Sequence, residues 1–381
     1  MSPIHPDSDG KVAELRATVR RAQLSWEPDT TSMSRLPRER FVRRLGAVPP
    51  PGVTLEAIAE QARSLRARAM AERAPAGLPA SFDLRDVDGK NYVTAIKDQG
   101  DCGSCVAFGT CAAIEGQVRR SLDEPDRAID LSEAHLFYCH GRAAGRSCST
   151  GWIPDDALRY CKSDGIADEA CYPYTAGDQN CTGRCSDWQD RAYKVTDFHV
   201  AGSPADAKQW LVQQGPLTAC FVVYDDFPYY KSGVYRMTQG AQQLGGHCVT
   251  IVGYDDGAGC WICKNSWGTG WGDGGFFRIG YGECGIDSWQ LCAIDGVTLP
   301  HEEEKPDEGE WRKNTLVQGL WSLDEERNAW VYAKDVGWRR IAYGDDATFA
   351  TLLTELAAAK AGGRPVNLLD QGGIITQAYV L

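Results

Sequence analysis

The order of apolar and polar positions divides the middle of the chain into a helical part and a strand-rich part. Helical patterns cover residues 104–120, 132–140 and 154–164. Beyond residue 216, short apolar runs instead predict strands at residues 217–224, 248–254, 260–264 and 275–279. Helices followed by strands are typical of an α+β unit with two lobes. We expect this unit to span residues 78–298.

Residues 1–77 show a different pattern, rich in arginine and poor in apolar side chains. They contain 13 Lys or Arg and 9 Asp or Glu. Two helices are predicted, at residues 11–24 and, after an N-cap at Thr54, at residues 55–72, with three prolines at 49–51 between them. The segment is either a flexible extension or a pro-segment that docks on an acidic enzyme, since the whole chain has a net charge of −12.

A third pattern begins at residue 299. Residues 299–310 are mostly charged or proline and predict an extended, solvated linker. Residues 311–381 predict a small ββαββ module, with hairpins at 329–343 and 366–380 and a helix at 347–361, capped by Asp346 and ended by Gly362-Gly363. The module contains no cysteine and no histidine, so a structural cap and a binding or targeting module both remain open.

Composition narrows the classes of partner. The acidic net charge disfavours nucleic acid and anionic membrane surfaces as main partners. No apolar run approaches the roughly 18 residues of a membrane span, and residues 1–10 lack the apolar stretch of a signal peptide.

Fifteen cysteines, all within residues 78–298, point to an extracellular or other oxidising compartment. Metal binding is disfavoured, because the two CxxC pairs, Cys102/Cys105 and Cys260/Cys263, lie about 155 residues apart in unrelated sequence contexts. We therefore expect no metal and no cofactor. The odd count fits one free reactive thiol and up to seven bridges.

Cys102 and Cys105 stand just before a predicted helix. A thiol at a helix N-terminus is favoured as the thiolate, and so becomes a nucleophile. Two chemistries use this arrangement. One is thiol–disulfide exchange by both cysteines, and the other is acyl transfer by Cys105 alone, with Cys102 held in a disulfide.

Acyl transfer needs a general base and a group that orients it. Among six histidines, His247 stands out, because the small residues Gly245 and Gly246 precede it and an apolar strand follows. His5 and His301 lie in the extension and the linker, His135 and His140 on a helix, and His199 in an ordinary strand context.

The orienting group and the oxyanion donors can be assigned from their positions in the sequence. Asn265, 18 residues beyond His247, can accept from the far ring nitrogen, and Trp267 can shield that bond from water. The backbone N–H of Cys105 and the side-chain amide of Gln99 can donate to an oxyanion.

Three motifs now occur in order: Gln99-Gly-x-Cys-Gly-Ser-Cys105-x-Ala-Phe, His247-x-Val-x-Ile-Val-Gly-Tyr and Lys-Asn265-Ser-Trp-Gly-Thr-Gly-Trp-Gly. Residues 78–292 resemble the papain-like cysteine peptidases, and the opening Leu-Pro-Ala-Ser-Phe-Asp resembles the cathepsin B branch. The resemblance implies a two-lobed fold with a helical and a β-barrel-like lobe. It also implies that Cys105 is the nucleophile, His247 the base and acid, Asn265 the orienting group and Gln99 an oxyanion donor.

The same resemblance implies disulfides and subsites. Cys102 pairs with Cys148 and Cys139 with Cys181, and we add Cys161–Cys171 as a further local pair; the other partners stay open. By the family pattern Gly151 binds substrate backbone, and Gly103 and Trp267 also lie in the cleft. Trp152 and Ile153 line the S2 pocket, with Gly246 and Trp289 at its base, which predicts hydrophobic residues at the substrate P2 position.

Several departures from the family pattern qualify this hypothesis. Val106 replaces the usual tryptophan after the nucleophile, and Gly246 replaces the usual Asp or Asn before the histidine. The insertion that makes the cathepsin B branch an exopeptidase is missing between Tyr174 and Cys181, so we expect an endopeptidase. The pro-segment lacks the family's long helix motif, and Glu39-Arg40-Phe41 matches only a fragment of it.

The sequence therefore predicts a monomeric cysteine endopeptidase zymogen. It cleaves protein or peptide substrates through a thioester on Cys105, and residues 1–77 block the cleft until they are removed near residues 76–80. Two alternatives stay open. One is a thiol–disulfide oxidoreductase using Cys102 and Cys105, and the other is an inactive papain-like homologue that serves as a binding protein.

Overall fold

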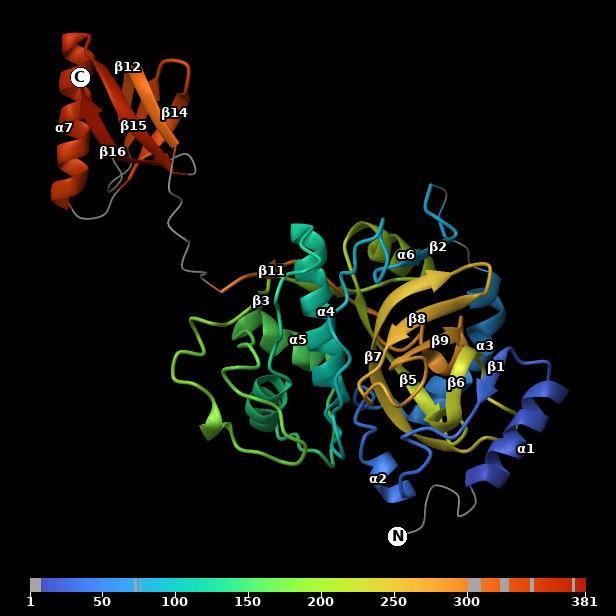
Figure 1. The fold of residues 1–381 in the computed structure, drawn as a ribbon. Coiled ribbons are helices and arrows are strands. Elements are labelled where there is room, and N and C mark those ends of the chain that lie inside the picture. The colour runs from blue at the N-terminus through green and yellow to red at the C-terminus, as the bar shows by residue number, and fades with distance from the viewer. Residues whose placement is uncertain are drawn as a thin grey trace. The chain divides into compact units, whose positions relative to one another are not determined.

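The structure is a computed structural model that describes residues 8–71, 74–75, 77–300, 310–322, 329–342, 346–371 and 374–381. The chain divides into two compact units, residues 1–300 and residues 301–381 (Figure 1). The sequence predictions for His5, Ala76, His301, Tyr343, the 372–373 turn and most of the 299–310 linker fall outside the described residues.

The first unit contains a helical lobe built around a long, central helix (Figure 1). This helix, α4 (Cys105–Leu122), ends at Asp123, which adopts a left-handed conformation with φ of 56°. The lobe also contains η1 (His135–Gly141), a π-helix, α5 (Pro154–Ser163) and η2 (Cys181–Gly183). All three predicted helices of this region are therefore present, although the second takes the wider π form.

Three disulfides tie this lobe. The pairs Cys102–Cys148 and Cys139–Cys181 are confirmed. The predicted Cys161–Cys171 pair is wrong, because Cys171 is bonded to Cys185 and Cys161 is a buried free thiol on α5. The backbone explains the choice: Cys185 N donates to Cys171 O at 3.0 Å, which brings these two residues together.

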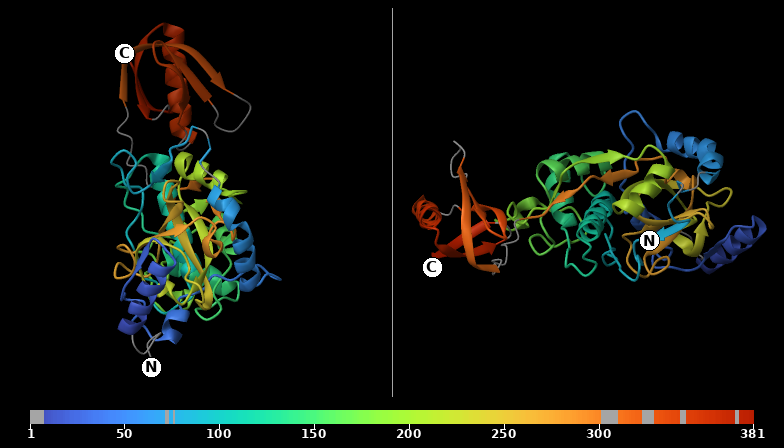
Figure 2. Two further views of the ribbon diagram at one scale, coloured as in Figure 1. Left: turned by 90° about the vertical axis from the view of Figure 1, so that its right-hand side faces the viewer. Right: turned by 90° about the horizontal axis from the view of Figure 1, so that it is seen from above.

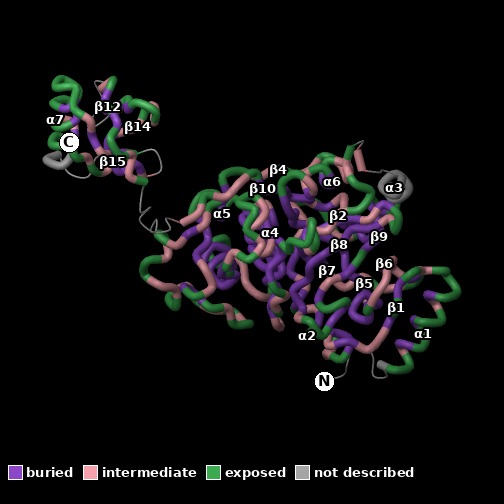
Figure 3. Tube along the Cα trace, turned by 45° about the horizontal axis from the view of Figure 1, so that its top comes forward, coloured by how far each residue is buried: buried purple, intermediate pink, exposed green. Residues whose placement is uncertain are grey.

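A nine-stranded sheet forms the second lobe, in the order β1-β6-β9-β8-β7-β5-β10-β4, with β2 paired to β7. Its central strands β5 and β8 are buried along their whole length, and Figure 3 shows buried residues concentrated in β5, β7, β8 and α4. The strands are β1 (Trp26–Pro28), β2 (Ser81–Asp83), β4 (Phe198–Val200), β5 (Leu217–Tyr224), β6 (Tyr230–Tyr235), β7 (Gln243–Asp255), β8 (Cys260–Lys264), β9 (Phe276–Gly280) and β10 (Cys292–Ile294).

Short elements complete this lobe and join it to the helices. They are β3 (Lys194–Val195), α6 (Pro204–Gln213), η3 (Phe227–Tyr229), η4 (Glu283–Gly285) and β11 (Val297–Thr298). Helix α4 packs against β7, and the right-hand view of Figure 2 shows it between the green helical segments and the yellow strands. The N-terminus of α4 therefore meets the second lobe, as a two-lobed α+β fold requires.

The N-terminal segment folds onto this unit and is not a flexible extension. It contains α1 (Ser8–Arg21), β1 (Trp26–Pro28), α2 (Arg38–Val42) and α3 (Leu55–Ala71). Strand β1 pairs antiparallel with β6 and extends the sheet, while Trp26 and Phe41 are buried in the common core. Burying an aromatic side chain of this kind contributes about 2 kcal/mol, so burial of these two side chains stabilises the docked segment.

The described residues of the second unit form a closed five-stranded barrel with one helix (Figure 1). Its elements are β12 (Glu310–Ser322), β13 (Ala329–Ala333), β14 (Gly337–Ile341), α7 (Asp346–Gly362), β15 (Pro365–Gln371) and β16 (Ile374–Val380). The sequence predicted four strands and missed β12. Its alternation is interrupted by a register shift that includes Asn314, whose φ is 55°. Asp346 begins α7 instead of preceding it.

No helix within the described ranges is both long and apolar enough to cross a membrane.

Candidate active site

Cys105 is the first residue of α4 and is fully buried. Its sulfur lies within hydrogen-bonding range of the backbone N–H groups of Gly46, Val106 and Cys248. Cys248 directly follows His247 on β7. The fold thus brings the thiol from the helical lobe to the strand that carries the predicted base.

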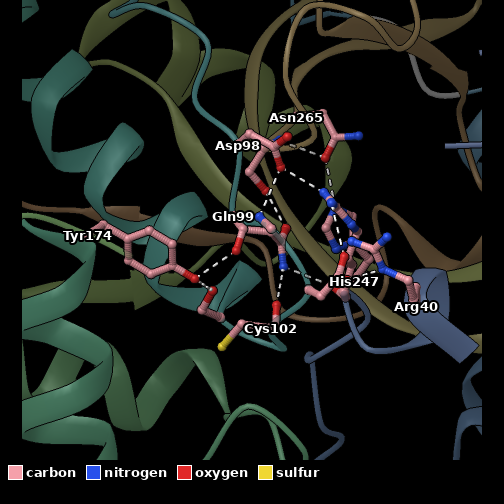
Figure 4. Close-up of polar contacts among 12 residues, drawn as sticks. Arg40, Asp98, Gln99, Cys102, Tyr174, His247 and Asn265 are labelled. Atoms are coloured by element: carbon pink, nitrogen blue, oxygen red, sulfur yellow. Dashed lines mark hydrogen bonds and ion pairs between the residues drawn. The ribbon is translucent and has the colours of Figure 1, made fainter. Parts of the chain in front are cut away.

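His247 and Asn265 form the hydrogen bond that the sequence predicts between them. The Nε2 atom of His247 lies 2.8 Å from Asn265 Oδ1 (Figure 4). Strand β8 ends at Lys264, one residue before Asn265, and pairs antiparallel with β7, which explains the 18-residue spacing. The opposite ring nitrogen, Nδ1, is buried and has no hydrogen-bond partner among the described residues.

Trp267 covers this pair. Its ring centroid is 4.5 Å from that of His247, with an interplanar angle of 30°, and the side chain is 1% exposed. Bulk water therefore has little access to the His247–Asn265 hydrogen bond in this state.

Gln99 is fixed by hydrogen bonds at both ends of its amide. Its Oε1 accepts from Ser266 Oγ at 2.7 Å, which leaves Nε2 to donate. Nε2 donates to Cys102 O at 2.8 Å and to Arg44 O at 2.9 Å. The predicted oxyanion donor is therefore oriented by the residue next to Asn265 and is satisfied by a carbonyl of the N-terminal segment.

The segment from Arg44 to Val48 passes through the site, between the two lobes, and forms an isolated β-bridge from Ala47 to Trp152. Gly46 O accepts from Trp152 N at 2.8 Å, and Val48 N donates to Trp152 O at 2.9 Å. On the other side, Ala47 N donates to Gly246 O at 3.0 Å. These hydrogen bonds occupy backbone groups on both sides of the cleft, where the family resemblance places the substrate.

Comparisons with known proteins agree with this geometry. Residues 78–294 match the model of the papain family of cysteine proteases. The chain belongs to this family. It is 38% identical over 223 residues to "Cathepsin B-like CP3" of Giardia intestinalis, a match that covers 55% of this chain and 72% of the relative.

Solved proenzymes of the family share the fold over more of the chain. Procathepsin B S9 from Trypanosoma congolense superimposes with a TM-score of 0.59 at 25% identity, covering 78% of this chain and 99% of that one. Procathepsin L 3 of Tenebrio molitor gives a TM-score of 0.58 at 26% identity, covering 76% and 88%. The papain-like fold and the activity of a cysteine-type peptidase are thereby established.

The predicted subsite residues of this papain-family peptidase lie around the inserted segment. A Cβ at Gly151 would lie 2.1 Å from Gly46 O, and one at Gly246 would lie 2.3 Å from Ala47 O and 2.5 Å from the Trp289 ring. Gly103 also faces Gly46, with a Cβ position 3.2 Å from its Cα. Close approach of backbone explains why each of these positions is glycine.

Trp152 and Ile153 contribute differently from one another. The indole of Trp152 is fully buried and packs against Phe137 and Tyr160 inside the helical lobe, so the segment meets its backbone. Ile153, 8% exposed, is the residue before α5.

Burial sets the protonation of the reactive pair in this state. It raises the pKa of the Cys105 thiol to about 12, reinforced by neighbouring Cys248 and only partly offset by the surrounding N–H groups. Burial also lowers the pKa of His247 to about 4, opposed by the Asn265 hydrogen bond and assisted by the positive charge of Arg44. The thiolate expected from the helix terminus is thus not the form present while the segment covers the site.

Sequence reasoning missed the residues that hold the segment in place. Arg44 pairs with Asp98 at 2.7 Å and Asp101 at 3.2 Å, and Arg40 also pairs with Asp101. Phe41 packs edge-on against Trp267, with ring centroids 5.1 Å apart. The clustered arginines at 38–44 and the acidic pair beside Gln99 were the available signal.

The disulfide pattern bears on the oxidoreductase alternative. Cys102 is bonded to Cys148, and Cys105 is a free thiol, so the two cysteines of the CxxC motif are chemically distinct. The three disulfides are consistent with an oxidising compartment. Among the described residues, no group of three or more His, Cys, Asp or Glu side chains is arranged to hold a metal ion.

Proposed function

We propose that the protein is the zymogen of a cysteine endopeptidase in which Cys105, His247, Asn265 and Gln99 carry out peptide hydrolysis. The observation that carries this proposal is the hydrogen bond from Gln99 Nε2 to Arg44 O. A donor that is buried, fixed by Ser266 and aimed at a backbone carbonyl beside a helix-terminal thiol is what an oxyanion site requires.

The proposed reaction follows from these positions. His247 takes the proton of the Cys105 thiol, the thiolate attacks the scissile carbonyl carbon, and the carbonyl oxygen becomes an oxyanion bound by Gln99 Nε2 and the N–H of Cys105. The His247 imidazolium protonates the departing amine, which leaves a thioester on Cys105. His247 then takes a proton from water, which hydrolyses the thioester and restores the thiol. Asn265 holds the imidazole in position throughout.

Residues 1–77 act in this proposal as an intramolecular inhibitor. The segment supplies a carbonyl to Gln99, places Gly46 N–H beside the nucleophile and occupies both backbone rims of the cleft. It also keeps the thiol and the imidazole neutral at pH 7. Removal near residues 76–80 frees the cleft, and we place the mature enzyme outside the cell or in another oxidising compartment, acting as a monomer on proteins or peptides.

We expect cleavage within chains, with hydrophobic residues preferred at P2. Only six residues separate Tyr174 from Cys181, which is too short for a loop that closes the cleft. Leu45 of the segment packs against Gly245, and Trp289 closes the space beside Gly246. A peptide library assayed with the processed enzyme should rank Leu, Val or Phe first at P2, and a first rank for Arg would contradict this assignment.

Acid should loosen the inhibitory segment. Because burial holds the pKa of His247 at about 4 while the segment is bound, protonation favours any state in which this pKa is nearer its ordinary 6.5. The bound state therefore keeps its full stability above pH 6.5 and loses it progressively as the pH falls toward 4. A difference of about 2.5 pKa units corresponds to roughly 150-fold weaker binding at pH 4, and to roughly 300-fold weaker binding well below that pH.

NMR titration of labelled histidines in the Cys105→Ala chain measures this effect. The His247 resonance should stay in its neutral form down to about pH 4 in the intact chain, and should titrate at higher pH once the segment is cleaved and removed. The same midpoint in both forms would refute the linkage. His199, an exposed histidine bonded to Asp295, serves as the internal control.

A further inference from the structure

The C-terminal barrel has a strand arrangement that is associated with binding. Its order is β12-β13-β14-β16-β15, closed by pairing of β15 with β12, and α7 lies between the third and fourth strands. Strands β14 and β16, the third and fifth along the chain, pair in parallel, and the other pairs are antiparallel. This is the topology of the OB-fold, in which the face of the second and third strands binds oligonucleotides or oligosaccharides.

In this chain the corresponding face carries an exposed aromatic pair. Tyr332 on β13 and Trp338 on β14 are register partners, with ring centroids 5.3 Å apart. They are 36% and 48% exposed, among the most exposed large apolar side chains of the described chain. Alternate residues of β13 are buried in the barrel, so this pair points outward because of the strand periodicity and not because of local disorder.

Strand β12, which pairs with β13 on this face, leaves room for the two rings. Gly319 on β12 is the register partner of Tyr332. A Cβ at Gly319 would lie 3.1 Å from the edge of the Trp338 ring and 3.1 Å from the Tyr332 Cβ. The indole therefore extends across two strands and rests on the β12 backbone, with its other side toward solvent.

A second pair of side chains lies next to Tyr332 and Trp338. Trp330 and Arg340 are register partners two residues away on β13 and β14, which places them on the same face. The face thus combines a run of aromatic rings with a planar hydrogen-bond donor. Such rings give a large contact area at low entropic cost, while their polar groups and the guanidinium can bond to hydroxyls.

Charge decides which ligand fits. Residues 310–381 carry eight Lys or Arg and nine Asp or Glu, and the whole chain has a net charge of −12. Binding of a polyanion draws its affinity from an excess of cations, and this module has no such excess. We propose that the β12–β13–β14 face of the C-terminal barrel binds an uncharged glycan, whose sugar rings stack on Trp338 and Tyr332.

Retention on insoluble polysaccharides tests this proposal with the full chain carrying Cys105→Ala, which keeps it intact. The probes are cellulose, chitin, β-1,3-glucan and mannan particles, and a 20-nucleotide oligo(dT) followed by fluorescence anisotropy. We expect retention on at least one polysaccharide, unchanged between 0.05 and 0.5 M salt. Trp338→Ala should reduce it at least tenfold, and Trp338→Tyr should largely restore it.

Tyr379→Ala is the matched control. Tyr379, on β16, is 57% exposed and stacks with Trp311, which lies in the first part of β12, where this strand pairs with β15 and not with β13, so its loss should change retention less than twofold. Thermal unfolding of each variant verifies the fold. No retention on any of the four polysaccharides would overturn the proposal, as would equal retention by Trp338→Ala. Salt-sensitive binding to oligo(dT) that Trp338→Ala abolishes would assign the face to nucleic acid instead.

Discussion

Replacing Cys105 by alanine should abolish peptide hydrolysis by the processed enzyme, with a loss on the order of 10⁶-fold in kcat. The reason is that only this thiol can form the thioester, and neither His247 nor Gln99 can substitute for a nucleophile. Hydrolysis of a fluorogenic peptide, with thermal unfolding as a check on folding, measures the effect. His247→Ala should cause a loss of similar size, because the residues of the site act as a unit.

Cys102 provides the matched control for this prediction. Cys102→Ala removes a disulfide between residues 46 apart in sequence, which should cost about 4 kcal/mol of stability by the chain-entropy relation. Activity per folded molecule should remain within about tenfold of wild type, since the thiol of Cys105 is untouched. Equal and complete loss in both variants, with both proteins folded, would favour thiol–disulfide exchange over acyl transfer.

Cleaving the chain after Gly77 should release at least 100-fold more peptidase activity than the intact chain has. A recognition sequence for a site-specific protease, placed between Gly77 and Leu78, allows the protein to fold before it is cut. This order matters because β1 extends the sheet and Phe41 is buried in the core, so the N-terminal segment must be present while the chain folds. Dilution after cleavage then separates the segment from the cleft.

Arg44→Ala should weaken binding of the cleaved segment roughly tenfold. Its side chain is 7% exposed and pairs with Asp98 and Asp101, but Asp98 is half-exposed, so solvent screens part of the interaction. Arg63→Ala is the control, because Arg63 pairs with Glu60 on the surface of α3. Inhibition constants for the cleaved segment give both values, and equal effects of the two substitutions would remove Arg44 from the docking contacts.

The sequence predicted most of the helices and strands, and the contact of His247 with Asn265, because these depend on local order. His247 lies on β7 and Asn265 directly follows the antiparallel neighbour β8, which a short turn joins to β7, so their spacing fixes their approach. Cys105 is the first residue of a helix, and the local sequence determines where that helix begins. These relations need no knowledge of long-range packing.

Long-range contacts account for what the sequence did not predict. Cys171 bonds to Cys185 and not to Cys161, because α5 directs Cys161 into the core. Strand β12 was not predicted because its pairing register shifts twice, once near Asn314 and once near Gly319, which interrupts the alternation of apolar and polar residues. Burial keeps the thiol neutral, and the backbone N–H of Gly46, which partly offsets that burial, lies 59 residues away along the chain and reaches Cys105 only in the fold.

Covalent labelling of the cleavable protein tests the central claim most directly. The protein is treated with an epoxysuccinyl peptide at pH 6.5 before and after removal of residues 1–77, and the adduct is located by peptide mass spectrometry. The account predicts one adduct, on Cys105, formed at least 100-fold faster after removal, while the other eight free cysteines stay unmodified because they are buried. Labelling of Cys105 at the same rate in both forms, or labelling of a different cysteine, would contradict it.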